Sequence, residues 1–218
     1  MRIFSPERKF LVLLYLLATS CGPTPQDVEI WSLDNTQEIG GNALEVVGNP
    51  EVAPGNDYLV FDGEQDGLLI DANPVAEMQA FTIEVDFMPG EGFPEQREQR
   101  FLHIQDPEDE SRRILLELRL NDKQEWYGDW FIRSEDESLT LMDSTKTHPV
   151  NEWYTMSLVY RNGKVRGLVN GKEEVSGDFK YLPINGNAKT SVGTRMDRRS
   201  WFKGAIREIR FKPLANSE

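Results

Sequence analysis

The chain has 218 residues and a formal net charge of −13, from 24 Lys and Arg against 37 Asp and Glu. Hydrophobic residues make up 39% of it, which is enough for a packed core and excludes a wholly disordered chain. The acidic balance excludes a binder of the nucleic-acid backbone, because no basic surplus exists to displace counterions. A single cysteine excludes both an internal disulfide framework and a cysteine-based zinc cluster.

The N-terminal segment has the pattern of a secretory signal peptide. A basic start precedes an apolar run over residues 10–18, which is too short to cross a bilayer as a helix. The run ends in the sequence LATSC, which resembles the lipobox of bacterial lipoproteins, although Leu is commoner at the position of Ala18. The resemblance implies that residues 1–20 are removed, that Cys21 is lipidated and that residues 21–27 are a spacer.

This reading predicts a lipid-anchored, extracytoplasmic protein of the bacterial cell envelope, attached to the membrane through Cys21. Several acyl chains on one cysteine anchor a protein stably, whereas a single chain does so only marginally. The alternative is an ordinary signal peptide in which the cysteine is incidental.

Residues 28–213 have the pattern of one all-β domain, with a short tail over residues 214–218. Apolar and polar residues alternate strictly over residues 81–87, which is typical of a half-buried strand. Asn-Gly pairs at 162–163 and 170–171 predict tight hairpin turns. Further strands are predicted at residues 28–33, 58–61, 68–70, 101–104, 114–120, 139–142, 154–160, 165–169 and 205–211. Many short strands with frequent turns favour a sandwich or barrel.

Four segments, in order, resemble laminin-G-like, concanavalin A-like jelly rolls. Residues 57–67 are similar to their "FDG…D" strand, residues 81–89 to their "FTI…P" strand, residues 151–171 to their paired hairpins, and residues 193–210 to their closing strand. The resemblance implies an all-β, two-sheet antiparallel jelly-roll sandwich with one concave sheet. It leaves function open, because this fold hosts lectins, glycan-binding modules, glycosidases, lyases and protein-binding domains.

Two residue patterns in the sequence could indicate a catalytic site. A retaining glycosidase needs two nearby carboxylates, but the third acidic position of the laminarinase-like motif is missing after Glu84 and Asp86, so these predict a solvated strand face. A polysaccharide lyase needs a base and a group that neutralises a uronate. The weak candidates for those roles are His103, Gln105 and Arg119. They qualify because the predicted strands point their side chains away from the core.

Sugar binding without catalysis needs aromatic faces and planar polar donors. The segment EWYGDWF at 125–131 places Trp126 and Trp130 on one side of a strand and Tyr127, Asp129 and Phe131 on the other, so the two sets cannot both be core. The predicted ligand-binding residues are Trp126, Trp130, Trp201, Arg100 and His103. Trp153 is assigned to the core.

The acidic segment 106–110 offers Asp106 and Asp109 as weak candidate ligands for Ca²⁺, an ion that takes oxygen donors. The alternative is a solvated acidic loop, and no other cofactor is expected.

Together these observations predict a membrane-anchored module that binds extracellular glycan without catalysis. The alternatives are a lyase or hydrolase that uses the concave sheet, and a protein-interaction domain of the envelope.

Overall fold

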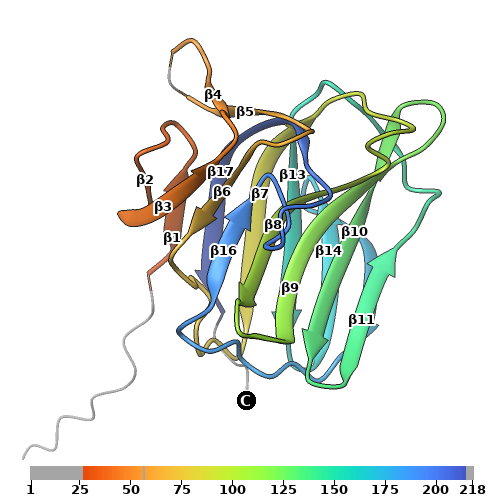
Figure 1. The fold of residues 1–218 in the computed structure, drawn as a ribbon. Coiled ribbons are helices and arrows are strands. Elements are labelled where there is room, and N and C mark those ends of the chain that lie inside the picture. Colours follow the sequence, from red (N-terminus) through yellow and green to blue (C-terminus); the bar gives the residue numbers. More distant parts are fainter. Residues whose placement is uncertain (1–26, 56, 215–218) are drawn as a thin grey trace, which may run out of the picture.

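The computed structural model describes residues 27–55 and 57–214. The predicted signal peptide, Cys21, most of the spacer and residues 215–218 lie outside these described residues. Within them the chain forms strands and no helix, so the described part contains no helix long and apolar enough to cross a membrane (Figure 1).

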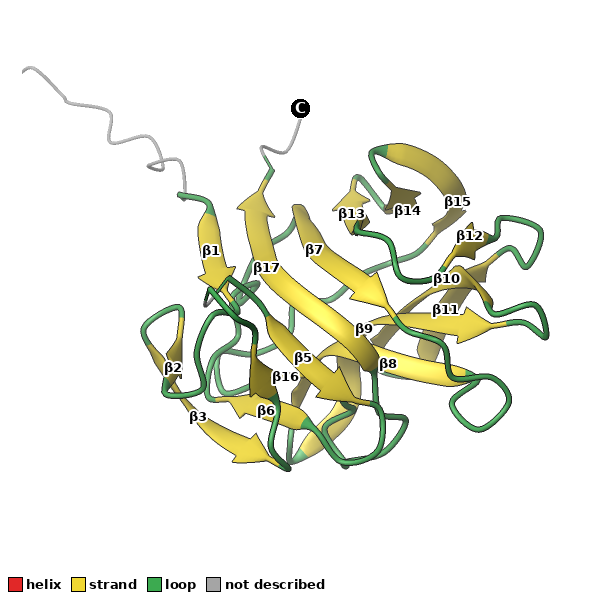
Figure 2. Cartoon of the chain, turned by 90° about the horizontal axis from the view of Figure 1, so that it is seen from above, coloured by secondary structure: helices red, strands yellow, loops and turns green. Residues whose placement is uncertain are grey.

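Two antiparallel sheets pack as separate layers, as Figure 2 shows. The eight-stranded sheet contains, in spatial order, β15 (Lys172–Asp178), β14 (Lys164–Val169), β13 (Tyr154–Arg161), β7 (Phe81–Pro89), β17 (Lys203–Pro213), β5 (Leu59–Asp62) and β4 (Glu51–Val52), with β1 (Glu29–Ser32) beside β17. The nine-stranded sheet contains β11 (Glu137–Met142), β10 (Glu125–Ser134), β9 (Asp109–Leu120), β8 (Glu98–Asp106), β16 (Lys189–Val192), β6 (Gly67–Ile70), β3 (Asn42–Val47) and β2 (Glu38–Ile39), with β12 (His148–Pro149) beside β10. The predicted two-sheet jelly-roll sandwich is confirmed.

Side-chain alternation decides which face of each strand meets the opposite sheet. In β7 the apolar set that starts at Phe81 and ends at Phe87 is fully buried, as the period of two predicts. The two Asn-Gly pairs form the turns on either side of β14, with φ of 51° and 75° at Asn162 and Gly163. Positive φ at both central residues matches the twist of a tight hairpin, so these predictions are confirmed.

Aromatic side chains join the two sheets. Phe87 of the eight-stranded sheet stacks on Phe101 of the nine-stranded sheet, with ring centroids 4.7 Å apart. Trp130 donates from Nε1 to the carbonyl oxygen of Ser157 at 2.9 Å, across the sandwich. Gly167 makes room for this indole, because a Cβ there would lie 2.5 Å from the ring. The core therefore depends on a large residue on one sheet facing a glycine on the other.

Several strands are not predicted by the sequence pattern, among them β3 and β15. Both have mostly exposed or half-buried side chains, because each covers little of the core. Without an apolar set at every second position, a strand carries no period-two signal. The partner of β3 is β6, which follows it by about twenty residues, whereas β15 pairs with β14 across the adjacent Asn170-Gly171 turn.

The outer face of the eight-stranded sheet corrects two expectations. Glu84 and Asp86 are not simply solvated, because Arg210 donates from Nε to Glu84 at 2.8 Å and from one Nη to Asp86 at 2.9 Å. These ion pairs and hydrogen bonds lower the pKa of both carboxyls, against burial, which raises it. Trp153 is half-buried on this face, with the Arg207 guanidinium 4.6 Å from its ring centroid, and so is not a core residue.

Candidate functional site

The outer face of the nine-stranded sheet gathers charged residues from three adjacent strands. Arg100 on β8 lies opposite Glu117 on β9, and Glu117 lies opposite Asp129 on β10. In the next outward row, Arg119 lies between Glu98 and Tyr127. Residues directly opposite on antiparallel strands share a face, so these side chains point to the same side. Figure 1 shows β8, β9 and β10 running side by side in front of the other sheet.

Ion pairs connect this charged cluster across the strands. Arg100 Nε lies 3.0 Å from a carboxylate oxygen of Glu117, and Arg119 Nε donates to Asp129 Oδ2 at 2.8 Å. The Glu98 carboxylate accepts a hydrogen bond from Arg119 and lies 3.7 Å from Arg100, so it bridges the two guanidiniums. Each buried carboxylate therefore has its own arginine.

The two buried carboxyls differ in how well they are satisfied. Burial, reinforced by the charge of Asp129 and opposed by Arg100, raises the pKa of Glu117 to about 7. Asp129 is only 1% exposed, and its Oδ1 atom has no hydrogen-bond partner among the described residues. A buried, unpaired carboxylate oxygen is costly, so this atom marks a place where a donor would be stabilising.

These residues surround a small depression of about 120 Å³ that is open to solvent. Its lining consists of Arg100, Arg113, Leu115, Glu117, Arg119, Asp129, Phe131, Thr140 and Arg195. The volume suits part of a ligand rather than a whole sugar chain. Predicted residues Arg100 and Arg119 both lie here.

The segment from β16 to β17 covers part of the same face. Within it, the Met196 N–H donates to His103 Nδ1 at 3.0 Å, and His103 is fully buried although it points away from the core set of β8. Burial and the charges of Arg195 and Arg113 lower the pKa of His103 to about 3. The prediction that His103 contacts a ligand or acts as a base is therefore wrong for this structure, because its imidazole is fully buried and its Nδ1 atom already accepts from the Met196 N–H. Gln105 is also buried, so only Arg119 of the lyase candidates lines the depression.

The tryptophan prediction is corrected for Trp126 and Trp130. They are 0% and 1% exposed and belong to the core, so neither offers a ring face to a ligand. The opposite set of the same strand, which starts at Tyr127 and contains Asp129, faces outward. The alternation separates the two sets correctly. The signal that could have identified the outward set is its charged member, Asp129, which lies on the same face as Glu117.

Trp201 is half-buried and lies at one end of the charged face. It lines a second depression of about 440 Å³, together with Arg97, Glu98 and Ser200. Arg100 donates a hydrogen bond to the Ser200 hydroxyl, which connects this depression to the charged cluster. Trp201 is thus the one predicted tryptophan whose ring borders a cavity near the candidate site.

The two acidic residues proposed for calcium are engaged in turn contacts. Asp106 accepts from the Glu108 N–H at 2.9 Å and from Asn185 Nδ2 at 2.6 Å, and Asp109 accepts from the Ser111 N–H at 2.8 Å. Over the described ranges, no group of three or more His, Cys, Asp and Glu side chains is placed to hold a metal ion. Calcium binding stays a prediction.

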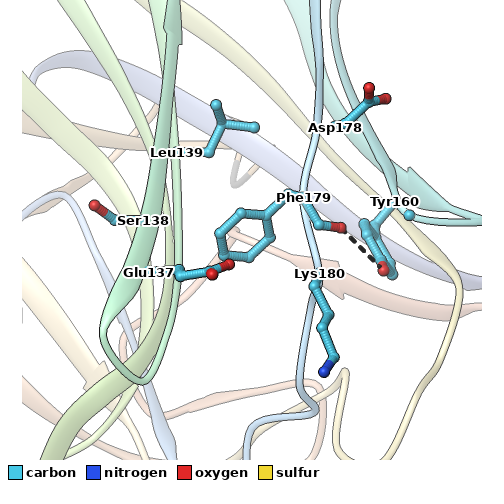
Figure 3. Close-up of a pocket in the computed structure, with 8 residues that line it drawn as sticks. Glu137, Ser138, Leu139, Tyr160, Asp178, Phe179 and Lys180 are labelled. Atoms are coloured by element: carbon cyan, nitrogen blue, oxygen red, sulfur yellow. Dashed lines mark hydrogen bonds between the residues drawn. The ribbon is translucent and has the colours of Figure 1, made fainter.

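A larger cleft of about 610 Å³ opens where β11 faces the segment after β15. Figure 3 shows Phe179 between Glu137 and Leu139 on one side and Tyr160 on the other, with a hydrogen bond of 3.4 Å from the Tyr160 hydroxyl to the Phe179 carbonyl oxygen. The charged residues of this cleft are exposed, and none of its lining residues, all of them described, has a buried polar atom without a partner. The charged face of the nine-stranded sheet is therefore the stronger candidate site.

A family model for the concanavalin A-like lectin/glucanases superfamily matches residues 62–218 of the chain. Among curated proteins, no sequence matches it. The fold is similar to that of domain 4 of AbnA, a GH43 extracellular arabinanase from Geobacillus stearothermophilus solved in complex with arabinotriose. That match has a TM-score of 0.64 and 16% identity, and covers 89% of this chain and 96% of that one.

Two further solved structures share the fold. A heptameric SAP-like pentraxin from Limulus polyphemus matches with a TM-score of 0.56 and 11% identity, over 72% of this chain and 76% of that one. The binding domain of botulinum neurotoxin DC, in complex with SialylT, matches with a TM-score of 0.61 and 12% identity, over 86% of this chain and 48% of that one.

Proposed function

Because the chain belongs to the concanavalin A-like lectin/glucanases superfamily, we propose that it binds carbohydrate on the outer face of the nine-stranded sheet. The observation that carries this proposal is the Oδ1 atom of buried Asp129, which has no partner among the residues that the structure describes and lies in a depression open to solvent. A sugar hydroxyl is a donor of the right size for such an atom. Arg100, Arg119 and Trp201 supply the planar donors and the aromatic face that sugar recognition uses.

The relatives support the same ligand class. The arabinanase domain was solved with arabinotriose, and the neurotoxin domain with SialylT. The identities are low, so these structures support a carbohydrate ligand for the fold and say nothing of this site's specificity.

The test is a glycan array followed by calorimetry on the full-length chain in detergent. Binding of at least one oligosaccharide should weaken when Arg119 or Trp201 is replaced by Ala. The matched controls are Arg166→Ala and Trp153→Ala, which change the same residue types on the other sheet. A protein that binds no glycan, or whose binding is unaffected by the site variants, would refute the proposal.

A second candidate function is glycoside hydrolysis at the same place. Glu117 and Asp129 are directly opposite on β9 and β10, and such pairs have Cβ atoms roughly 4.5–5.5 Å apart. A carboxyl of raised pKa beside a second carboxyl is the arrangement that acid–base cleavage of a glycosidic bond uses. Release of reducing sugar by the wild type, and its loss in Glu117→Gln, would favour hydrolysis over binding alone.

We also propose that Cys21 carries the lipid that attaches the protein to the bacterial envelope. The support is the LATSC sequence after a basic start and an apolar run. Palmitate labelling of the wild type and its absence in Cys21→Ala, with release of the variant from the membrane fraction, are the expected results. A Cys21→Ala protein that remains in the membrane fraction would contradict this.

A further inference from the structure

We propose that the depression between β8, β9 and β10 selects an acidic sugar, a uronate whose carboxylate binds Arg113 and Arg195 and whose hydroxyl donates to Asp129. This inference rests on the proposed carbohydrate binding and names the class of sugar. Two groups on the walls of the depression support it, because each lacks an adequate partner among the described residues.

The first of these groups is a hydrogen-bond acceptor, the Oδ1 atom of Asp129. Arg119 satisfies Asp129 Oδ2, and Oδ1 stays without a donor in the described part of the chain. An inorganic anion would leave Oδ1 unsatisfied and would add repulsion. A metal ion would satisfy it, but the described residues do not bring together three suitable ligands. A neutral hydroxyl is the remaining common donor, and sugars present several.

The second group is a pair of arginine side chains whose carboxylate partners are exposed to solvent. Arg113 and Arg195 have side chains 13% and 15% exposed, and their carboxylate partners, on Glu110 and Asp197, are 65% and 44% exposed. Exposed ion pairs contribute little, so these two guanidiniums are poorly neutralised. In addition, Arg113 Nε is buried and has no hydrogen-bond partner within residues 27–55 and 57–214. Burial and the charges of Arg195 and Arg133 lower the pKa of Arg113.

The arginines nearer Asp129 are already neutralised. Arg100 is paired with Glu117, and Arg119 with Asp129 and Glu98. The local surplus of positive charge is therefore at the Arg113 end of the depression. An anionic group of a ligand would be attracted to that end, although the protein as a whole has a charge of −13.

The geometry lets one ligand reach both ends. Along the ladder, Phe131 stands between Asp129 and the Arg133 position that opposes Arg113. The Arg113 guanidinium lies over the Phe131 ring, 5.3 Å from its centroid, which brings its charge toward Asp129. Leu115 and Phe131 give the depression an apolar wall against which the C–H face of a sugar ring can pack.

A carboxylate fits this site better than a sulfate does. A planar carboxylate accepts two parallel hydrogen bonds from one guanidinium, and of the four arginines that line the depression, Arg113 and Arg195 are the two whose carboxylate partners are exposed. A neutral sugar would satisfy Asp129 but leave the arginine pair without an anion. A uronate supplies both the hydroxyl donor and the planar acceptor within one ring.

The experiment compares oligouronates with their carboxyl-reduced counterparts, which keep every ring hydroxyl and lose only the charge. Calorimetry uses the full-length protein in detergent with oligogalacturonate, oligoglucuronate and oligomannuronate, each beside its reduced form and a sulfated neutral oligosaccharide. At least one oligouronate should bind about 10-fold or more tightly than its reduced form, as a charge-assisted contact predicts. Arg113→Gln and Arg195→Gln should each reduce that preference, whereas Arg166→Gln on the other sheet should not.

Asp129→Asn separates the two halves of the proposal. It should weaken the reduced form, which keeps the hydroxyl, more than the oligouronate, because removing the Asp129 charge also removes a repulsion that only the anionic sugar feels. Melting temperatures of all variants identify any that are unfolded, and Arg195→Gln, in a connecting segment, is the variant least tied to the core. Equal binding of charged and reduced sugars, tighter binding of the sulfated sugar, or a preference that survives both arginine variants would overturn the uronate inference while leaving carbohydrate binding intact. If no sugar binds, the proposed function itself fails.

Discussion

Glu117 and Asp129 face each other across β9 and β10 on the outer side of the nine-stranded sheet, two buried carboxyls directly opposite in register. Like charges in this position destabilise a sheet unless other groups compensate. Here Arg100 lies against Glu117 and Arg119 against Asp129, and the raised pKa of Glu117 reduces the repulsion further. The pair links the stability of the sheet to the chemistry of the candidate site.

Replacing Glu117 by Gln should change how stability depends on pH. The pKa of Glu117 is raised from 4.5 to about 7, so its neutral form is favoured in the folded protein. Its contribution to stability is full below pH 4.5 and is lost as the pH rises to 7. Relative to Glu117→Gln, the wild type should lose about 2–3 kcal/mol of unfolding free energy over that range. Urea titrations at pH 4.5, 6 and 8 measure this, and a pH-independent difference would contradict it.

Arg119→Ala should destabilise the protein by about 2–3 kcal/mol, because it leaves neither oxygen of buried Asp129 with a donor from residues 27–55 or 57–214. Arg119→Lys should recover only part of the loss, since an ammonium cannot reproduce the guanidinium geometry. The control Arg166→Ala removes an exposed pair and should change stability by less than about 0.5 kcal/mol. Equal effects at the two arginines, measured by denaturant unfolding, would show that Asp129 does not depend on Arg119.

Gly167→Ala should be strongly destabilising, by about 2 kcal/mol or more, because its Cβ would meet the Trp130 ring at 2.5 Å inside the core. Gly186→Ala is the matched control, since its Cβ meets no atom within 4 Å and its φ is not positive. It should leave the melting temperature almost unchanged. A Gly167→Ala protein as stable as the wild type would mean that the Trp130 ring can move aside.

The tryptophans should separate into two groups. Trp126→Ala should cost about 3–5 kcal/mol of unfolding free energy, because it empties a fully buried site. Trp201→Ala should lower affinity for the glycan found by the array with little change in stability, because its ring is half-buried at a rim. Thermal melts and calorimetry on the same preparations measure both effects. Loss of stability at Trp201 without loss of binding would reverse the assignment.

Much of the strand pattern could be predicted because it is local. The alternation in β7 and the Asn-Gly turns beside β14 are decided by residues close in the chain, and the structure confirms them. The alternation does not predict β3 and β15, because neither strand has buried apolar residues at every second position. Within the candidate site, the sequence predicts Arg100 as a ligand-binding residue and Arg119 as an outward lyase candidate, and the structure places both in one depression.

The wrong predictions for Trp126, Trp130 and His103 have a common physical origin. Period-two alternation divides β10 into two faces but does not show which face the other sheet covers. The sequence therefore predicts Trp126 and Trp130 as ligand-binding residues, although the opposite set faces outward. His103 also points away from the core set, yet the segment before β17 covers it through the Met196 N–H. Both outcomes depend on elements more than twenty residues away.

By itself the residue pattern determined an all-β fold, most of its strands, its turns and the two sides of each strand, because backbone sterics and side-chain alternation are short-range, and the family resemblance added the sandwich. Only the tertiary structure decided which sides are core, which carboxyls are buried together and which histidine is covered. Burial, ion pairing and pKa depend on what packs against a residue from distant strands, and those contacts form only when the two sheets close on each other.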